Sequence, residues 1–417
     1  MNFKIEHQMT KTNIQWKELL TKKIIICFFT GFTSGLPLFI LISLFPAWLV
    51  ESGLDLKAIG LFALIQLPYA WKFIWAPLFD RFTLAMGRRR GWLIIFQTIL
   101  LFLISLCGFI DPKSQIMTIA VVSLGIAFFS ASQDVVIDAY RRELLLDPEL
   151  GLGNAVHVNA YKFASLVPGS LSLILADFFS WEFVFTITGL FMIPGIILTI
   201  LISEPKLKSA PPKTMKEAIV DPFKEFIGRK GIRNALLILL FIFLYKIGDS
   251  MATALATPFY LDLGFSMTEI GIIAKNAGLW TSIAGGIIGG IWMVKLGINR
   301  ALWIFGLLQM FATLSFAWLA TVGYDNTVLA ITVGLEFFAA GLGTTAFVAF
   351  IAKTTNPKYT ATQFALFTSL ASVPRTFTNA STGYFVDFFG WYYFFVFCFL
   401  LAIPGMLLLF KIAPWKK

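Results

Sequence analysis

The sequence predicts an all-α membrane protein with about 12 transmembrane helices in two parallel six-helix repeats. Three observations predict it: scarce charge, regularly spaced apolar segments and an internal repeat. Of the 417 residues, 58% are hydrophobic and only 13% are charged, whereas soluble domains carry roughly 25% charged residues. Too few polar residues exist to cover a soluble protein of this length, so lipid must be the solvent for most of its surface.

Apolar runs of about 20 residues are long enough to cross a bilayer as helices. The longest gap between them, 204–233, is rich in proline and charge and divides the runs into two groups of six. We therefore expect an N-terminal bundle in 1–203, a linker in 204–233 and a C-terminal bundle in 234–417. Within the linker, 215–227 has the pattern of an amphipathic surface helix interrupted by Pro222. The expected spans are 23–50, 56–79, 91–110, 116–140, 152–178, 181–203, 234–261, 267–294, 301–321, 327–353, 360–386 and 388–412.

The positions of the basic residues predict the orientation. Of the 33 Lys and Arg residues, only Lys57 and Lys113 lie in odd-numbered loops. Positive charge accumulates on the cytoplasmic side, so we expect both termini and the linker in the cytoplasm. Topology thereby explains the net charge of +10, and we expect the lipid bilayer, not nucleic acid, as the large partner.

The two groups of helices contain matching segments. Asp177–Trp181 recurs as Asp387–Trp391, and Ile193–Gly195 recurs as Ile403–Gly405, both 210 residues later. Because six helices separate equivalent positions, the two copies have the same orientation in the membrane, which is a parallel repeat. Coincidence in a Phe-rich apolar sequence is the alternative.

The loop after the second span contains Asp80-Arg81 and, further on, Gly87-Arg88-Arg89-Arg90. This resembles the signature of the major facilitator superfamily, and the equivalent loop of the second half has Gly290, Lys295, Gly297 and Arg300, with Val294 in the place of the acid. The resemblance implies a charged latch between the halves on the cytoplasmic side; ordinary topogenic charge is the alternative. The expected latch residues are Asp80, Arg81, Arg88, Arg89, Arg90, Asp138 and Arg141.

Longer stretches resemble the AmpG muropeptide permease family of Gram-negative bacteria. They are Leu67–Arg81, Ser132–Glu143, Tyr245–Asp249 and Ala361–Leu366. The resemblance implies a proton-driven importer in the bacterial inner membrane, without a cofactor, whose substrates are anhydro-muropeptides. A major facilitator transporter of another anionic solute, such as an acyl-CoA or a peptide, is the alternative. We expect a monomer.

Several charges fall inside the expected spans, where each costs a few kcal/mol and normally faces a cavity or a partner. Asp249 and Arg375 lie nearer the periplasm. Four others lie near the midplane: Lys162, Lys246, Lys275 and Glu336. Their sum is positive, which suits a substrate with several carboxylates. The expected substrate-binding residues are Lys162, Lys246, Lys275, Arg375, Gln133 and Tyr161.

Proton coupling needs a carboxylate whose protonation responds to burial and to a nearby cation. Asp134, Asp249 and Glu336 are the candidates. Lys246 and Asp249 are three residues apart, so they share a helix face and can pair; a permanent structural salt bridge is the alternative to a pair exchanged during transport.

Other energy sources and function classes have little support. The sequence has no Gly-x-x-x-x-Gly-Lys-Ser/Thr phosphate loop, so an ion gradient is the expected energy source. With two histidines and no His-Glu-x-x-His motif, no metal site is expected. We do not expect an enzyme; a membrane-embedded enzyme and a sensor that kept a transporter fold remain as alternatives.

Overall fold

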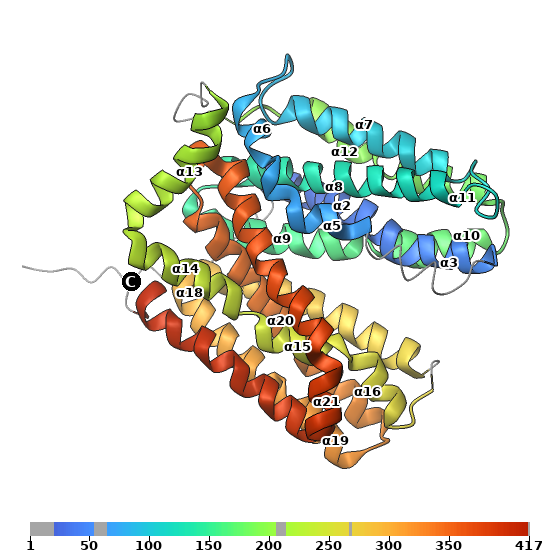
Figure 1. The fold of residues 1–417 in the computed structure, drawn as a ribbon, viewed down its shortest axis with the longest axis vertical. Coiled ribbons are helices and arrows are strands. Elements are labelled where there is room, and N and C mark those ends of the chain that lie inside the picture. Colours follow the sequence, from blue (N-terminus) through green and yellow to red (C-terminus); the bar gives the residue numbers. More distant parts are fainter. Residues whose placement is uncertain (1–20, 54–64, 206–213, 267–268, 416–417) are drawn as a thin grey trace, which may run out of the picture.

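The computed structural model describes residues 21–53, 65–205, 214–266 and 269–415, most of them in helices (Figure 1). The side chains of Lys275 and of residues 373–381 lie outside this description. The predictions for Lys57, for the Lys275 side chain and for the Arg375 side chain therefore fall outside the described residues.

The helices of the first half follow the expected spans. The first span is α2 and α3 joined by a π-helical turn, and the fifth is divided between α9 and α10. The bounds are α2 Lys22–Phe39, α3 Phe45–Glu51, α5 Leu67–Trp71, α6 Ala76–Arg81, α7 Arg90–Cys107, α8 Ile116–Leu144, α9 Leu150–Phe163, α10 Ser172–Ala176, α11 Trp181–Leu190 and α12 Ile193–Leu201.

The linker helix and the second half complete the chain. The linker helix α13 continues through Pro222 to Lys230, three residues beyond the end expected from the sequence. The bounds are α13 Met215–Lys230, α14 Ile232–Leu244, α15 Ile247–Ala254, α16 Ala256–Asp262, α18 Asn276–Ala312, α19 Leu314–Val322, α20 Asn326–Thr354 and α21 Thr360–Ile412, with a π-helical segment Ile270–Lys275 before α18.

Two of the long helices turn back on themselves at a glycine. Gly297 in α18 has φ 73° and Gly390 in α21 has φ 69°. A residue with a side chain rarely adopts this left-handed conformation, whereas glycine does so at little cost. Each of these helices therefore contains the end of one expected span and the start of the next.

Eight stretches of the described residues are long and apolar enough to cross a membrane, and one of them, Ile272–Val322, contains the turn at Gly297. They cover the expected spans 1, 3, 4, 6 to 10 and 12. The second span begins in residues outside the description. The exact count of twelve spans therefore stays a prediction.

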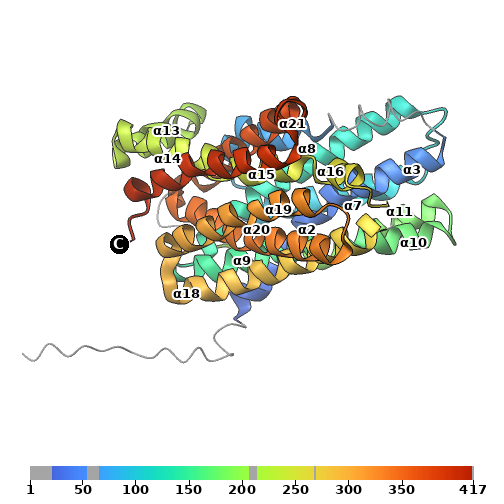
Figure 2. The ribbon, with the colours of Figure 1, turned by 90° about the horizontal axis from the view of Figure 1, so that it is seen from below.

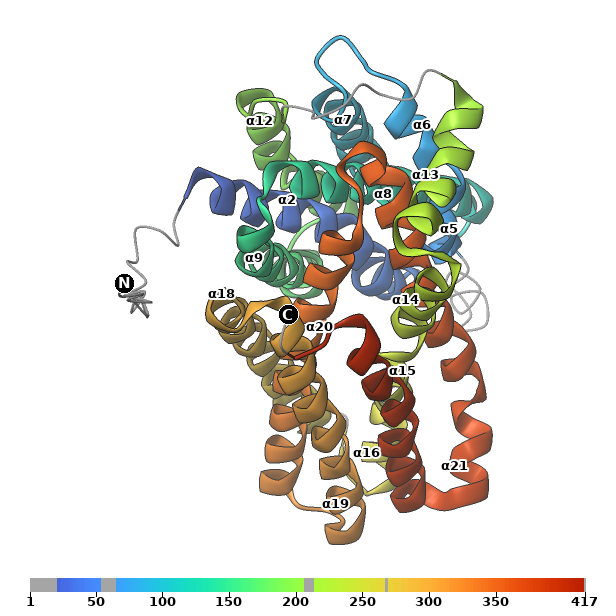
Figure 3. The ribbon, with the colours of Figure 1, turned by 90° about the vertical axis from the view of Figure 1, so that its left-hand side faces the viewer.

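The helices form two bodies. Figure 1 shows α2 to α12 in one body and α14 to α21 in the other; the two meet at the end that carries α13 and the C-terminus and diverge toward the opposite end. Figure 2 shows the same polarity, with α13 and α14 at one end and α3, α10 and α11 at the other. Figure 3 looks onto the meeting end, where α9 lies beside α18. The bodies thus meet toward one end and are apart at the other.

Candidate functional site

The predicted latch is built around the carboxylate of Asp80, at the C-terminal end of α6. Arg88 Nη2 and Arg89 Nη2 each lie 2.8 Å from Asp80 Oδ1. The carboxylate also reaches the other body, where the backbone N–H of Thr362 (2.8 Å) and of Ala361 (3.2 Å) and the Thr362 hydroxyl (2.7 Å) donate to it. Free N–H groups at a helix start attract anions, so Asp80 holds the first turn of α21.

The latch charges are fully removed from water. Burial alone would raise the pKa of Asp80, but the charges of Arg89 and Arg88 and the N–H of Thr362 outweigh it, so this pKa lies below its ordinary value. Burial works against the charge of Arg89 too, yet Glu143 and Asp80 raise its pKa above the ordinary value. The latch is therefore a neutralised ion network, in which removing one member leaves its partners buried and unpaired.

Glu143, near the end of α8, makes a second contact between the bodies. Its Oε1 accepts from Arg89 Nη2 (2.6 Å) and from the Thr360 hydroxyl (2.7 Å). Arg88 Nη2 also lies 3.4 Å from the carbonyl oxygen of Lys358. We call Asp80, Arg88, Arg89 and Glu143, with Thr360–Thr362, the charged seam.

Three of the expected latch residues have other partners. Arg90 Nη2 donates to the carbonyl oxygen of Ile200 (2.6 Å), at the end of α12 in its own body. Arg81 lies over the ring of Phe82, 5.3 Å from its centroid, and makes no ion pair within the described residues. Asp138 pairs with Arg141 in the same helix (2.7 Å), not with a loop arginine. Arg141 itself lies 5.8 Å from the ring centroid of Phe364 in the other body.

A second seam between the bodies, at the contact of α9 and α18, has a different chemistry. A Cβ placed on Gly290 would lie 2.3 Å from Cβ of Ala155, and one placed on Gly286 would lie 2.5 Å from Nδ2 of Asn159. Distances this short are not possible between such atoms, so glycine is required for the two helices to approach so closely. We call Gly151, Ala155, Asn159, Gly286, Gly290 and Met293 the glycine seam.

Further along the same two helices, the side chain of Lys162 in α9 reaches the other body. Its Nζ donates to the hydroxyl of Ser282 in α18, and its charge interacts with those of Lys246 and Asp249. Lys162 is the penultimate residue of α9, just before the helix breaks. Two of the expected substrate-binding cations, Lys162 and Lys246, thus lie within electrostatic range of each other although they belong to different bodies.

Lys246 lies at a break as well, between α14 and α15. Its Nζ is 2.9 Å from Asp249 Oδ2 and 3.2 Å from Thr344 Oγ1. The carboxylate of Glu336, on α20, interacts electrostatically with that of Asp249. Neither oxygen of Glu336 has a hydrogen-bond partner within the part of the chain that the structure describes. Two of the proton-coupling candidates, Asp249 and Glu336, are therefore adjacent to each other and share one cation.

The third candidate, Asp134, belongs to a separate polar group inside the first body. Its Oδ1 accepts from the Ser34 hydroxyl (2.5 Å), and the charge of Lys72, a buried residue, interacts with it. Gln133 Nε2 donates to the carbonyl oxygen of Thr33 (2.8 Å), which ties α8 to α2. The ring of Tyr161 packs on that of Phe39, with 5.4 Å between centroids.

Sequence reasoning missed several members of these groups. Lys72 is a lysine inside an expected span, so the criterion that selected Lys162 could have found it. Glu143 lies within a stretch that supported the family resemblance, but nothing in its spacing indicates a contact with Arg89 and Thr360. Ser282 gave no signal, because serine is common in membrane helices.

Comparison with known proteins agrees with this geometry. The family model described as Major Facilitator Superfamily matches residues 27–378. The anhydromuropeptide permease of Escherichia coli strain K12 is 41% identical over 382 residues, which cover 91% of this chain and 77% of that protein. The chain belongs to the AmpG permease family of the Major Facilitator Superfamily. It is therefore a multi-pass membrane transporter and not an enzyme.

Two further comparisons give a relative of similar length and the fold. An uncharacterized protein of Haemophilus influenzae is 49% identical over 410 residues, covering 96% of both chains. The crystal structure of FucP, a Major Facilitator Superfamily transporter in the outward conformation, superposes with a TM-score of 0.70 at 13% identity and covers 96% of this chain and 99% of that one. At this identity the structural likeness shows the fold alone.

Proposed function

We propose that the protein imports anhydro-muropeptides across the bacterial inner membrane by proton-coupled alternating access. The observation that carries the substrate assignment is the 41% identity to the E. coli anhydromuropeptide permease over most of the chain. In this proposal residues 1–203 and 234–417 are the two moving bundles, 204–233 is the linker, and both termini are cytoplasmic.

The charges between the bodies support an anionic substrate. Lys162 and Lys246 face the same region from different bodies, and both lie where a membrane helix is interrupted. Interrupted helices near the midplane expose backbone groups and are where many transporters bind their substrates. Carboxylates of the muropeptide peptide stem would bind between these two cations.

The arrangement of the bodies supports the direction of transport. The charged seam and the glycine seam both lie at the end that carries α13, and the bodies diverge toward the other end (Figure 1). With the orientation predicted from the basic residues, the closed end is cytoplasmic. In this state the lysines would receive substrate from the periplasm.

Proton coupling is assigned to the group around Lys246. A substrate carboxylate that binds Lys246 competes with Asp249, which then faces Glu336 without its cation. A proton bound between the two carboxylates would remove their repulsion. Substrate and proton would therefore bind together, which is the requirement for symport. Asp134, with Lys72 beside it, is the second candidate for the proton site.

The test is uptake by the purified protein in liposomes. We expect accumulation of labelled anhydro-muropeptide under an inward proton gradient and loss of accumulation when a protonophore is added. Lys246→Gln removes the charge that binds a substrate carboxylate and should lower uptake at least tenfold. A loss of about 1.4 kcal/mol in the free energy of substrate binding corresponds to that factor. Lys113→Gln, a change of an exposed lysine in a loop, is the matched control and should leave uptake unchanged.

Two outcomes would contradict the proposal. Accumulation of a different anionic solute, such as an acyl-CoA or a peptide, with no uptake of anhydro-muropeptide would contradict the substrate assignment. The assignment as a transporter would still stand. Muropeptide uptake that persists without a proton gradient would contradict the proposed proton coupling. A series of muropeptides with shortened peptide stems, used as competitors, would then define which carboxylates bind.

A further inference from the structure

The linker helix α13 has a face that the described part of the protein leaves nearly half exposed. Ile219, Phe223 and Ile227 are 46%, 43% and 42% exposed. They follow one another at intervals of four residues, so they form one stripe along the helix. Large apolar residues in a continuous exposed stripe mark an interaction surface.

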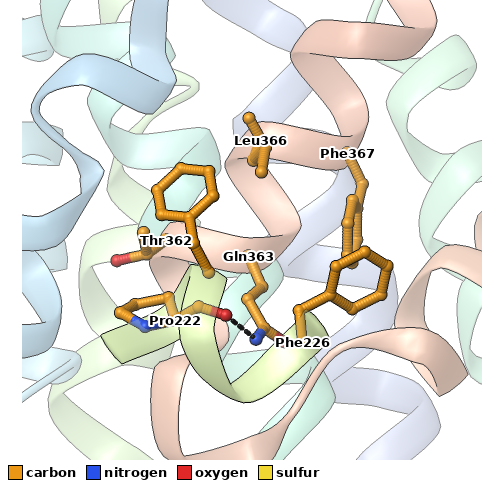
Figure 4. A pocket seen from close by; sticks show the side chains of 7 residues that line it. Pro222, Phe226, Thr362, Gln363, Leu366 and Phe367 are labelled. Atoms are coloured by element: carbon orange, nitrogen blue, oxygen red, sulfur yellow. Dashed lines mark hydrogen bonds between the residues drawn. The ribbon is translucent and has the colours of Figure 1, made fainter. Parts of the chain in front are cut away.

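Other side chains of α13 hold it against α21. Phe223 lies at the border between the two sides, because it also lines a small pocket with Pro222, Leu366 and Phe367. Pro222 and Phe226 face α21, where the carbonyl oxygen of Pro222 accepts from Gln363 Nε2 (2.9 Å) and the ring of Phe226 packs on that of Phe367, 5.2 Å between centroids (Figure 4). Glu225 Oε2 also accepts from Gln363 Nε2 (2.8 Å). The helix is thus fixed to the first turns of α21, and its rotation about its own axis is determined.

Charge is divided between the two flanks of this buried face. At about 100° per residue, Glu217, Asp221 and Glu225 lie on one flank, and the first two interact with Lys358 of the protein. The apolar stripe lies on the other flank, together with the exposed Lys216. An amphipathic helix with apolar and basic residues on one side is typical of helices that lie in a membrane interface.

The position of α13 in the fold identifies the surface that the stripe contacts. Figure 3 shows α13 along one edge of the meeting end, next to α6 and α14. The membrane-spanning stretch Ile232–Asp262 begins two residues after α13 ends, and its Ile232, Leu236 and Leu240 are exposed as well. Arg233 and Lys411 line a surface hollow at this junction, where a lipid phosphate would neutralise them.

We propose that α13 is an interfacial helix, with Ile219, Phe223 and Ile227 inserted among the lipids of the leaflet at the closed end and anionic headgroups along its basic side. Because Gln363 is adjacent to Thr362, which binds Asp80, the bilayer surface then holds the same turn of α21 that the charged seam holds. The inference requires only that α14 spans the bilayer, so its failure would leave the proposed transport function intact.

The test compares two neighbouring positions on α13. Ile227→Cys and Gly228→Cys are made in the full chain, labelled with a small fluorophore and placed in phosphatidylcholine–phosphatidylglycerol vesicles. Both positions are exposed, and a Cβ at Gly228 meets nothing within 4 Å, so both variants should fold. The native Cys27, Cys107 and Cys398 are buried and should not react.

Nitroxide-labelled lipids should quench the label at Ile227→Cys at least about threefold more than the label at Gly228→Cys, because only the former lies on the apolar flank. Iodide in the water should quench the two in the opposite order. Equal iodide quenching at both positions, with no difference in quenching by lipid, would overturn the proposal and leave the stripe as a surface for a protein partner.

Discussion

The two seams that close one end of the molecule arise from equivalent parts of the duplicated unit, yet they use opposite chemistry. In the charged seam, Asp80 at the end of the second span binds the start of α21 through N–H groups and arginines. In the other half the acid is replaced by Val294, and Gly290 instead packs against Ala155 of α9. Duplication fixed where the bodies meet, but not the interaction that holds them.

The difference has a physical consequence for switching. The charged seam is held by a few directional contacts, so it separates when those contacts break. The glycine seam is held by dispersion over a close helix-to-helix contact, which changes gradually as helices rock. We therefore expect changes at the charged seam to have the larger effect on which end of the protein is open.

The largest effect is expected for Asp80→Ala. It leaves Arg88 and Arg89 buried with one acid fewer, which should destabilise the closed end by about 3–5 kcal/mol. The distance between spin labels on Met86 and Lys353, exposed residues of different bodies at this end, should increase. Asp111→Ala removes an exposed carboxylate at a distant loop and is the control. An unchanged distance in Asp80→Ala would mean that Asp80 does not hold the closed end.

A smaller effect is expected for Gly290→Ala in the glycine seam. The added methyl would overlap Ala155, and overpacking of this kind costs about 1–3 kcal/mol. The same spin-label distance should increase, and the second substitution Ala155→Gly should restore it because it removes the overlapping methyl. If the double variant is as open as Gly290→Ala, close packing at this position is not what holds the seam.

The charged seam should stay closed over the pH range near neutrality. The pKa of Asp80 lies below its ordinary value, so its contribution is present above the ordinary aspartate pKa and is lost only as the pH falls through the lowered one. The distance between Met86 and Lys353 labels, measured without substrate and without a gradient, should be constant from about pH 5 to pH 8. A transition in this range that Asp80→Asn abolishes would show that the latch itself titrates.

The smallest effect is expected for Arg81→Ala. The guanidinium lies over Phe82 and makes no described ion pair, and a contact of this kind contributes about 0.5–1 kcal/mol at an exposed site. Uptake should change by about fivefold or less, while Arg88→Ala should lower it much further. Equal losses in the two variants would mean that Arg81 joins the latch in another state of the transport cycle.

The sequence predicted where the helices run but not how adjacent charges are used. The pairing of Lys246 with Asp249 follows from local spacing, which is why it was expected, whereas the left-handed turns at Gly297 and Gly390 were not predicted. The three consecutive arginines could not be sorted, because Arg88 and Arg89 lie in a turn and only Arg90 begins a helix, so no regular period fixes where their side chains point. Arg88 and Arg89 share Asp80, whereas Arg90 binds carbonyl oxygens of α12.

Contacts that cross between the bodies were the least predictable. The partners of Asp80 on α21 lie 281 and 282 residues away in the sequence, and the hydrogen bond from Lys162 to Ser282 spans 120 residues. Only the packing of the two bundles determines such pairs. Lys162, Lys246, Asp249 and Glu336 lie within electrostatic range of one another, while Asp134 lies in a polar group of its own.

The most direct test of alternating access measures both ends of the protein at once. Spin labels on Met86 and Lys353 report the seam end, and labels on Lys113 and Asp387, exposed residues of different bodies at the other end, report the diverging end. When anhydro-muropeptide and acidic pH are supplied together, we expect a longer distance at the seam end and a shorter one at the other. Distances that stay fixed, or that change in the same sense at both ends, would contradict alternating access by these two bodies.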